Sequence, residues 1–198
     1  MTELEYLEDL AGGSWTGLRF ETDAPRRSSG LGRLCAAVGR SFYAETVLDC
    51  EQLSCVGAPR NLGRDGDDDG LAGRMAEHTG LSPEAAERII SQTPRLAEPA
   101  GLIRLGRVTD PDVLVGYVAP ESAMKLLRRW QLVHGSVLDM PLSSFMSVCS
   151  CVAAAAGEGR PAISFGCKDA RTHGGLPDGR LVVALPATLV RTLRDGRC

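Results

Sequence analysis

Five of the seven cysteines lie in four short segments that are far apart in the chain, over residues 32–35, 54–58, 149–151 and 164–171. Thiolates are the soft ligands that iron–sulfur clusters and zinc prefer. A disulfide framework explains this set poorly, because the cysteines are odd in number and widely scattered. The pattern therefore predicts a metal or iron–sulfur site assembled from separate segments.

Cys167 is the best single candidate. It follows a predicted strand and comes directly after Gly166, and three residues that carry or transfer protons come next: Lys168, Arg171 and His173. Glycine permits a close backbone approach, and nearby cations favour the thiolate that binds metals or attacks electrophiles. If the site is catalytic, Lys168 and Arg171 would orient a small anionic substrate and His173 would move a proton. The alternative is a strand-end cysteine beside a solvated basic turn.

The other cysteines differ in their local patterns. Cys55 follows an extended segment and precedes a turn at Gly57, whereas Cys35 falls on an amphipathic helix, where plain burial is the ordinary explanation. Cys149 and Cys151 lie two apart on a predicted helix and point to nearly opposite sides, because each residue turns a helix by about 100°. Cys149 lies on the apolar stripe, which favours Cys151 as the ligand.

Composition limits the function classes. A chain of 198 residues suits one domain, and a net charge of −3 argues against nucleic-acid binding. The acidic start resembles no signal peptide, and no apolar run is long enough to span a bilayer, so we expect a cytoplasmic protein without a membrane partner. We expect a single domain over 1–198, with an N-terminal extension over 1–28 and a cysteine domain over 29–193.

The periodicity of apolar residues predicts an α+β fold. A mainly antiparallel sheet of short strands packs with about five helices, the longest over 120–134. Strands 103–108 and 113–118 are consecutive and form a predicted hairpin around residues 109–112. No glycine-rich nucleotide motif is present. The apolar stripe of helix 120–134 predicts core burial, with a homodimer contact as the alternative, so the sequence leaves the oligomeric state open.

The acidic stretch 64–70 superficially resembles a calcium-binding loop. The twelfth position counted from Asp65 is Ala76, where a calcium loop needs a bidentate glutamate. We therefore interpret this stretch as a solvated loop.

Several of these motifs resemble domain-of-unknown-function family 169. The most specific is Gly-x-Pro-x-x-Ser-x-Gly-Cys-x-x-x-Arg, which runs from Gly159 to Arg171. Looser similarity covers residues 55–63, 117–120 and 182–186, so the resemblance extends over about residues 29–193. It singles out four positions: Cys35, Cys55, Cys151 and Cys167. This family is catalogued without an assigned activity, so the resemblance implies a shared site and names no reaction.

These observations lead to the hypothesis of a [4Fe–4S] protein with those four cysteines as ligands. The turns at Gly57 and Gly166 would supply backbone N–H groups to the cluster. If three cysteines bind, the open iron could take a small anionic substrate, as in an iron–sulfur-dependent lyase, sulfur-transfer or redox enzyme. Because the chain also contains Cys50 and Cys149, the sequence does not decide which cysteines are the ligands. One alternative is a metal-free thiol or persulfide enzyme, and another is a zinc- or haem-binding accessory protein.

Overall fold

The computed structural model describes residues 1–21, 30–64, 68–140, 142–143 and 146–196. In this part of the chain, seven strands form one sheet in the order β2-β3-β1-β4-β7-β6-β5. All neighbouring strands are antiparallel except β5 and β6, which confirms the predicted α+β class with a mainly antiparallel sheet. The strands are β1 (Ser14–Glu21), β2 (Thr46–Asp49), β3 (Leu102–Gly106), β4 (Val113–Val118), β5 (Leu142–Ser143), β6 (Ala162–Ser164) and β7 (Leu181–Pro186).

The predicted hairpin of two consecutive strands is wrong. Strands β3 and β4 both pair with β1, which lies between them, so Gly17 faces Gly106 on one side and Leu114 on the other. The β3–β4 connection passes close to β1 at Gly17, where an added Cβ would lie 3.0 Å from Val108. Strand β1, in the predicted N-terminal extension, is therefore a central strand of the sheet.

The described residues contain nine α-helices, more than the five or so predicted. Three of these helices were not predicted. Two of them, α3 and α8, are only four and five residues long. The third, α4, begins within the predicted acidic loop, of which residues 65–67 lie outside the described part. The Ser82 side chain accepts from the Ala85 N–H and so caps the helix that begins at Pro83. The helices are α1 (Glu3–Ala11), α2 (Leu34–Ser41), α3 (Ala58–Asn61), α4 (Asp68–Thr79), α5 (Pro83–Gln92), α6 (Pro120–His134), α7 (Ser147–Gly157), α8 (Lys168–Thr172) and α9 (Ala187–Asp195).

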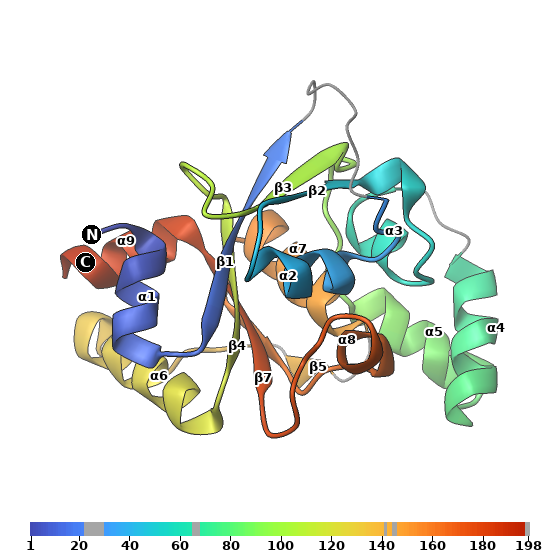
Figure 1. The fold of residues 1–198 in the computed structure, drawn as a ribbon. Helices are drawn as coiled ribbons and strands as arrows, with labels where there is room; N and C mark the ends of the chain where they lie inside the picture. Colours follow the sequence, from blue (N-terminus) through green and yellow to red (C-terminus); the bar gives the residue numbers. More distant parts are fainter. Residues whose placement is uncertain (22–29, 65–67, 141, 144–145, 197–198) are drawn as a thin grey trace.

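Helices cover both faces of the sheet (Figure 1). Helices α2 and α7 pack on the face that we call the thiol face, and α1, α6 and α9 pack on the opposite, apolar face. Alternation along β4 sends Val115 and Tyr117 to the thiol face and Leu114 and Val118 to the apolar face. A third, smaller cluster joins α4 and α5 at the side of the molecule.

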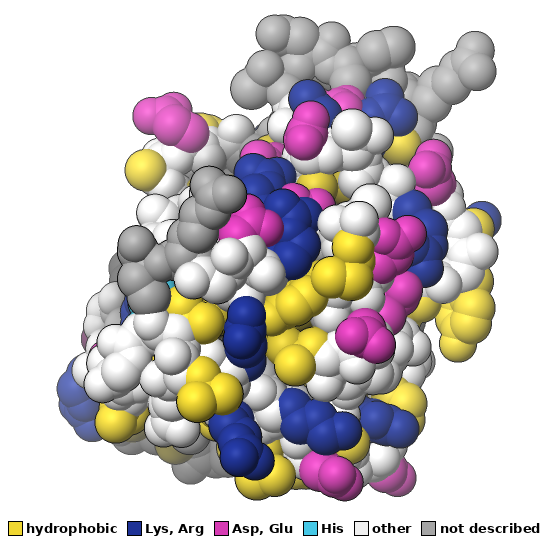
Figure 2. Space-filling model, turned by 90° about the vertical axis from the view of Figure 1, so that its left-hand side faces the viewer, with side chains coloured by type: hydrophobic (Ala, Val, Ile, Leu, Met, Phe, Trp, Pro, Cys, Tyr) yellow, Lys and Arg dark blue, Asp and Glu magenta, His cyan; other side chains and the backbone are white. Residues whose placement is uncertain are grey.

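Charged side chains surround the helices of the apolar face. Arg191 of α9 pairs with Glu3 of α1 at 2.7 Å, and Arg107 pairs with Glu8 at 2.8 Å. Figure 2 shows this end of the molecule, where basic and acidic side chains alternate with apolar ones. None of the described helices is long and apolar enough to cross a membrane.

Candidate metal centre

Six described cysteines, Cys50 among them, lie in or against the hydrophobic cluster of the thiol side, and five of the six come from the four predicted segments. Cys35 belongs to α2, Cys55 precedes α3, Cys149 and Cys151 belong to α7, and Cys167 immediately precedes α8. Cys35, Cys149 and Cys151 are buried, whereas Cys55 and Cys167 are half-buried. All five are free thiols. The four cysteine-bearing segments of the sequence therefore lie within one hydrophobic cluster.

Backbone contacts bring the first two segments together. The Ser54 N–H donates to the carbonyl oxygen of Gly32 at 2.8 Å, and the Ser54 hydroxyl donates to the same oxygen at 3.2 Å. A side chain at Gly32 would collide with Ser54. This close approach aligns the segment that enters α2 with the segment that contains Cys55.

A second close approach joins α2 to the loop that follows α8. An added Cβ on Gly39 would overlap the carbonyl oxygen of Gly174, and one on Gly174 would lie 2.9 Å from the carbonyl oxygen of Cys35. These two glycines let the α8 loop lie directly against α2. The contact places the segment of Cys167 beside that of Cys35.

Cys55 and Cys149 form a hydrogen-bonded thiol pair. The hydrogen bond from Cys149, with backbone N–H donors at Gly57 and Ala58, lowers the pKa of Cys55 to about 6 against the opposing effect of burial. The same hydrogen bond, burial and nearby thiols raise the pKa of Cys149 well above its ordinary value. Cys55 is therefore the thiolate of the pair and Cys149 its donor.

Two further cysteines complete an electrostatically coupled set of four. Burial and, to a smaller extent, the charges of Cys55 and Cys167 raise the pKa of Cys35 to about 12. The charges of Cys35 and Cys167 also raise the pKa of Cys149. We call Cys35, Cys55, Cys149 and Cys167 the thiol quartet. Burial and, to a smaller extent, the charge of Cys167 raise the pKa of Cys151 to about 12. Cys167 is the one member of the thiol quartet among these causes.

An ion pair borders the thiol quartet. The Cys55 sulfur lies 3.7 Å from Asp169 Oδ2, so the protonated thiol can donate to that carboxylate, whose charge opposes ionisation of the thiol. Arg33 Nε lies 3.4 Å from the same oxygen. Arg33 and Asp169 lie next to cysteine motifs in the sequence. This proximity is the sequence signal from which they could have been predicted as site residues.

The three predicted catalytic residues lie around α8. Arg171 donates to the carbonyl oxygen of Phe165 at 2.6 Å and pairs with Asp178 at 3.3 Å, so its guanidinium holds the loop around α8 in place. Lys168 and His173 are exposed. The roles of these residues toward a substrate stay predictions. Gly166 has a φ of +89°, a conformation that glycine adopts without strain.

Tyr117 has a buried hydroxyl without a hydrogen-bond partner among the described residues. Its side chain is 5% exposed, and its ring packs edge-on against Phe42 at 4.8 Å between centroids. Burial raises the pKa of Tyr117 well above its ordinary value, and the charges of Cys35, Cys167 and Cys149 raise it further. The hydroxyl therefore stays protonated beside three thiols of the quartet. Alternation along β4 was the sequence signal for its position.

The thiol quartet can be tested against two kinds of metal site. Among the described residues, no three His, Cys, Asp or Glu side chains form a group that could hold a metal ion. One zinc ion needs its ligands about 2.3 Å from a single point, whereas a cluster binds each thiolate at a different iron. The all-sulfur donor set and the unpaired hydroxyl of Tyr117 fit the chemistry of a cluster.

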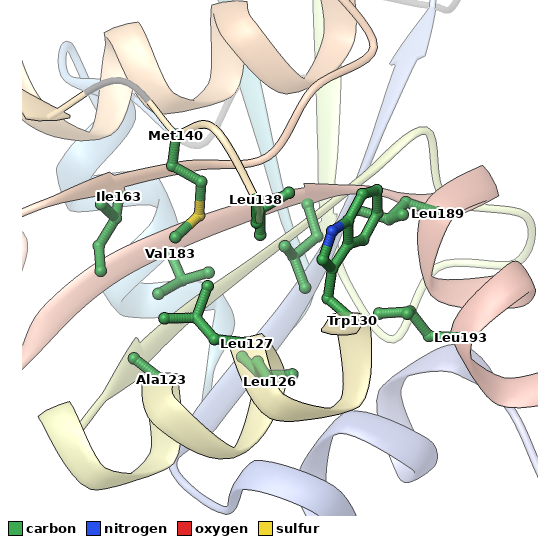
Figure 3. A pocket seen from close by; sticks show the side chains of 11 residues that line it. Ala123, Leu126, Leu127, Trp130, Leu138, Met140, Ile163, Val183, Leu189 and Leu193 are labelled. Atoms are coloured by element: carbon green, nitrogen blue, oxygen red, sulfur yellow. The ribbon is translucent and has the colours of Figure 1, made fainter. Parts of the chain in front are cut away.

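An apolar cavity lies on the other face of the sheet, between α6, α9 and the strands (Figure 3). Its volume of about 20 Å³ has room for about one water molecule. Its lining carries no ionisable side chain: Ala123, Leu126, Leu127, Trp130, Leu138, Met140, Ile163, Val183, Leu185, Leu189 and Leu193. This cavity therefore offers no side chain that could act as an acid, a base or a nucleophile.

Comparison with known families gives one match. A family model described as "Uncharacterised ArCR", the domain of unknown function 169, matches residues 16–195. The match begins within β1 and ends at the last residue of α9, so it includes all of the sheet except the first two residues of β1. Neither the curated proteins nor the solved structures give a match.

Proposed function

The chain belongs to domain-of-unknown-function family 169, and we propose that it is an iron–sulfur protein that binds one [4Fe–4S] cluster at the thiol quartet. The observation that carries this proposal is the convergence of Cys35, Cys55, Cys149 and Cys167 from four separate segments into one coupled group. Thiolates match the softness of iron and neutralise its charge. The cytoplasm, where thiols stay reduced, is the compartment that suits such a site.

The ligand from α7 in this proposal is Cys149. A hydrogen bond links its thiol to Cys55, and the charges of Cys35 and Cys167 raise its pKa. The pKa of Cys151, by contrast, is raised by the charge of Cys167 and by that of no other described cysteine. Cys151 was the ligand that the sequence favoured. The two cysteines therefore form a matched pair for experiment, because both are buried on the same helix.

The surroundings of the thiol quartet support an anionic sulfur centre. The backbone N–H groups of Gly57 and Ala58 donate to the Cys55 sulfur, as backbone N–H groups do around the sulfur atoms of cluster sites. The guanidinium of Arg33 offsets the negative charge of Asp169, the carboxylate that opposes ionisation of Cys55. If three thiolates bind, the remaining iron is open to a small anionic substrate, for which Lys168 is an exposed cation on α8.

The proposal is tested by anaerobic reconstitution with ferrous iron and sulfide, followed by iron, sulfide and zinc analysis. We expect about four irons and four sulfides per chain in the wild-type protein. Cys149→Ser should lose most of this content, and Cys151→Ser should keep it. Equal loss in both variants would assign Cys151 to the ligand set as well. A wild-type protein that takes up no iron contradicts the proposal.

A second candidate function rests on the hydrogen-bonded Cys55–Cys149 pair. In a metal-free thiol enzyme, the Cys55 thiolate attacks one sulfur of a disulfide substrate and releases the first substrate thiolate. Cys149 then loses its proton and attacks the Cys55 sulfur, which releases the second thiolate and leaves a Cys55–Cys149 disulfide. The two electrons that reduce the substrate come from this pair.

The two candidates differ in a direct measurement. Iron-free protein incubated with a small aromatic disulfide should release two thiols per chain and gain one disulfide if the second candidate holds. Cys149→Ser should release only one, because the mixed disulfide on Cys55 is then not resolved. Absence of thiol release from the wild-type protein excludes this candidate.

A further inference from the structure

The hydroxyl of Tyr117 is a buried polar group on the thiol side that has no hydrogen-bond partner among the described residues. The Tyr117 side chain is only 5% exposed. An unpaired buried hydroxyl is costly, and native structures rarely leave one without a reason. A ligand that is missing from the protein alone is one such reason.

The backbone of Gly174 lies close beside this hydroxyl. An added Cβ on Gly174 would lie 2.9 Å from the Tyr117 hydroxyl oxygen and 2.9 Å from the carbonyl oxygen of Cys35. Gly174 is itself buried. The absence of a side chain at this position therefore leaves the Tyr117 hydroxyl uncrowded between α2 and the α8 loop.

Tyr6 shows what the fold does with a buried tyrosine that has no ligand to meet. Tyr6 is 8% exposed on the apolar face, and its hydroxyl donates to the carbonyl oxygen of Leu193 at 3.1 Å. The two tyrosines are similarly buried and differ in whether the protein supplies an acceptor. Of these two tyrosines, the one without an acceptor is therefore the one on the thiol side of the molecule.

We infer that the Tyr117 hydroxyl donates a hydrogen bond to a sulfur atom of the cluster held by the thiol quartet. This inference rests on the proposed function and assigns Tyr117 as a positioning residue for the bound group. Hydrogen bonds to the sulfur atoms of a cluster stabilise its more negative, reduced state, and so raise its reduction potential. The same bond slows loss of the cluster.

The test compares Tyr117→Phe with Tyr6→Phe after anaerobic reconstitution with ferrous iron and sulfide. We expect Tyr117→Phe to take up the same iron and sulfide as the wild type, to release iron to a chelator roughly tenfold faster, and to show a more negative reduction potential. Tyr6→Phe should match the wild type in all three measurements. Circular dichroism before reconstitution establishes that both variants are folded.

Each outcome bears on the inference. Wild-type release rate and potential in Tyr117→Phe overturn it, even though the cluster itself is then established. A wild-type protein without iron uptake overturns the proposed function and the inference together. If Tyr117→Phe fails to fold, Gly174→Ala replaces it, because the added methyl group crowds the hydroxyl and should accelerate iron release; an unchanged release rate there also overturns the inference.

Discussion

Tyr6 and Tyr117 lie on opposite faces of the same sheet, and both are buried. On the apolar face the hydroxyl of Tyr6 has a backbone acceptor, and ion pairs link α1 to α9 at the surface. On the thiol face the hydroxyl of Tyr117 has no partner among the described residues, and neither does that of Ser147. The two tyrosine hydroxyls thus differ in whether the protein supplies an acceptor, although the apolar side also has buried nitrogens without a partner among the described residues, at Trp130 Nε1 and His134 Nε2.

We propose that this difference between the two hydroxyls accompanies a difference in role, in which the thiol face carries the chemistry. A face built for stability alone gains nothing from unpaired buried hydroxyls or from a thiolate held among other thiols. Functional sites are where proteins depart from such rules. Three experiments can break or sharpen the contrast between the faces.

The largest expected effect is on the ionisation of Cys55. Alkylation of iron-free protein by iodoacetamide should increase as pH rises through about 6, because the thiolate is the reactive form and Cys149 stabilises it. The ordinary thiol value is 9.0, so the midpoint is displaced by about three pH units. Mass spectrometry of alkylated peptides measures the midpoint at Cys55.

Cys149→Ala is the variant that isolates the cause of this displacement. Loss of the hydrogen bond should move the alkylation midpoint of Cys55 upward, toward its ordinary value. Cys151→Ala is the matched control and should leave it in place. A midpoint near 9 in the wild-type protein would show that Cys55 is an ordinary thiol. The thiol face would then hold no stabilised thiolate to distinguish it from the apolar face.

The next effect is on stability. Leu7→Ala truncates a fully buried side chain on the apolar face and should lower the free energy of unfolding by about 3 kcal/mol, measured by urea denaturation. Leu132→Ala, at a position 73% exposed, should change it by less than about 0.5 kcal/mol. Iron uptake by folded Leu7→Ala protein should equal that of the wild type. Reduced uptake would show that the faces are not independent.

The smallest effect distinguishes the two tyrosines in the iron-free protein. Tyr6→Phe should lower the free energy of unfolding by about 1 kcal/mol, because a satisfied hydrogen bond is lost. Tyr117→Phe should leave it unchanged or raise it by up to about 1 kcal/mol, because an unpaired buried hydroxyl is removed. Urea denaturation measures both. Equal destabilisation of the two variants would contradict the assignment of Tyr117 as unpaired.

The fold class and the longer helices could be predicted from sequence because they depend on local patterns. Ser82 caps α5 and Gly135 ends α6 in the left-handed conformation, as their types and spacing indicate. The pairing of β1 with both β3 and β4 depends on contacts between residues about 90 positions apart, and local alternation does not encode such contacts. This is why the hairpin prediction failed.

The choice between Cys149 and Cys151 shows the same limit at the candidate site. The helical argument assigned an inward stripe to α7, but every residue from Ser147 to Ala155 is buried. A helix enclosed on all sides has no outward face, so the angle between two cysteines does not say which one meets a given partner. Tyr117 was not predicted as a site residue because an aromatic side chain on a buried strand is usually part of the hydrophobic core.

The position of β1 in the middle of the sheet has a consequence during synthesis. Residues 14–21 leave the ribosome long before residues 102–118, which pair with both edges of that strand. At a translation rate of roughly 5–20 residues per second, β1 waits on the order of 5–20 s with its hydrogen-bonding groups unmatched. The nascent chain is exposed to edge-to-edge association during that interval, and shielding of its first strand would then aid recovery of folded protein.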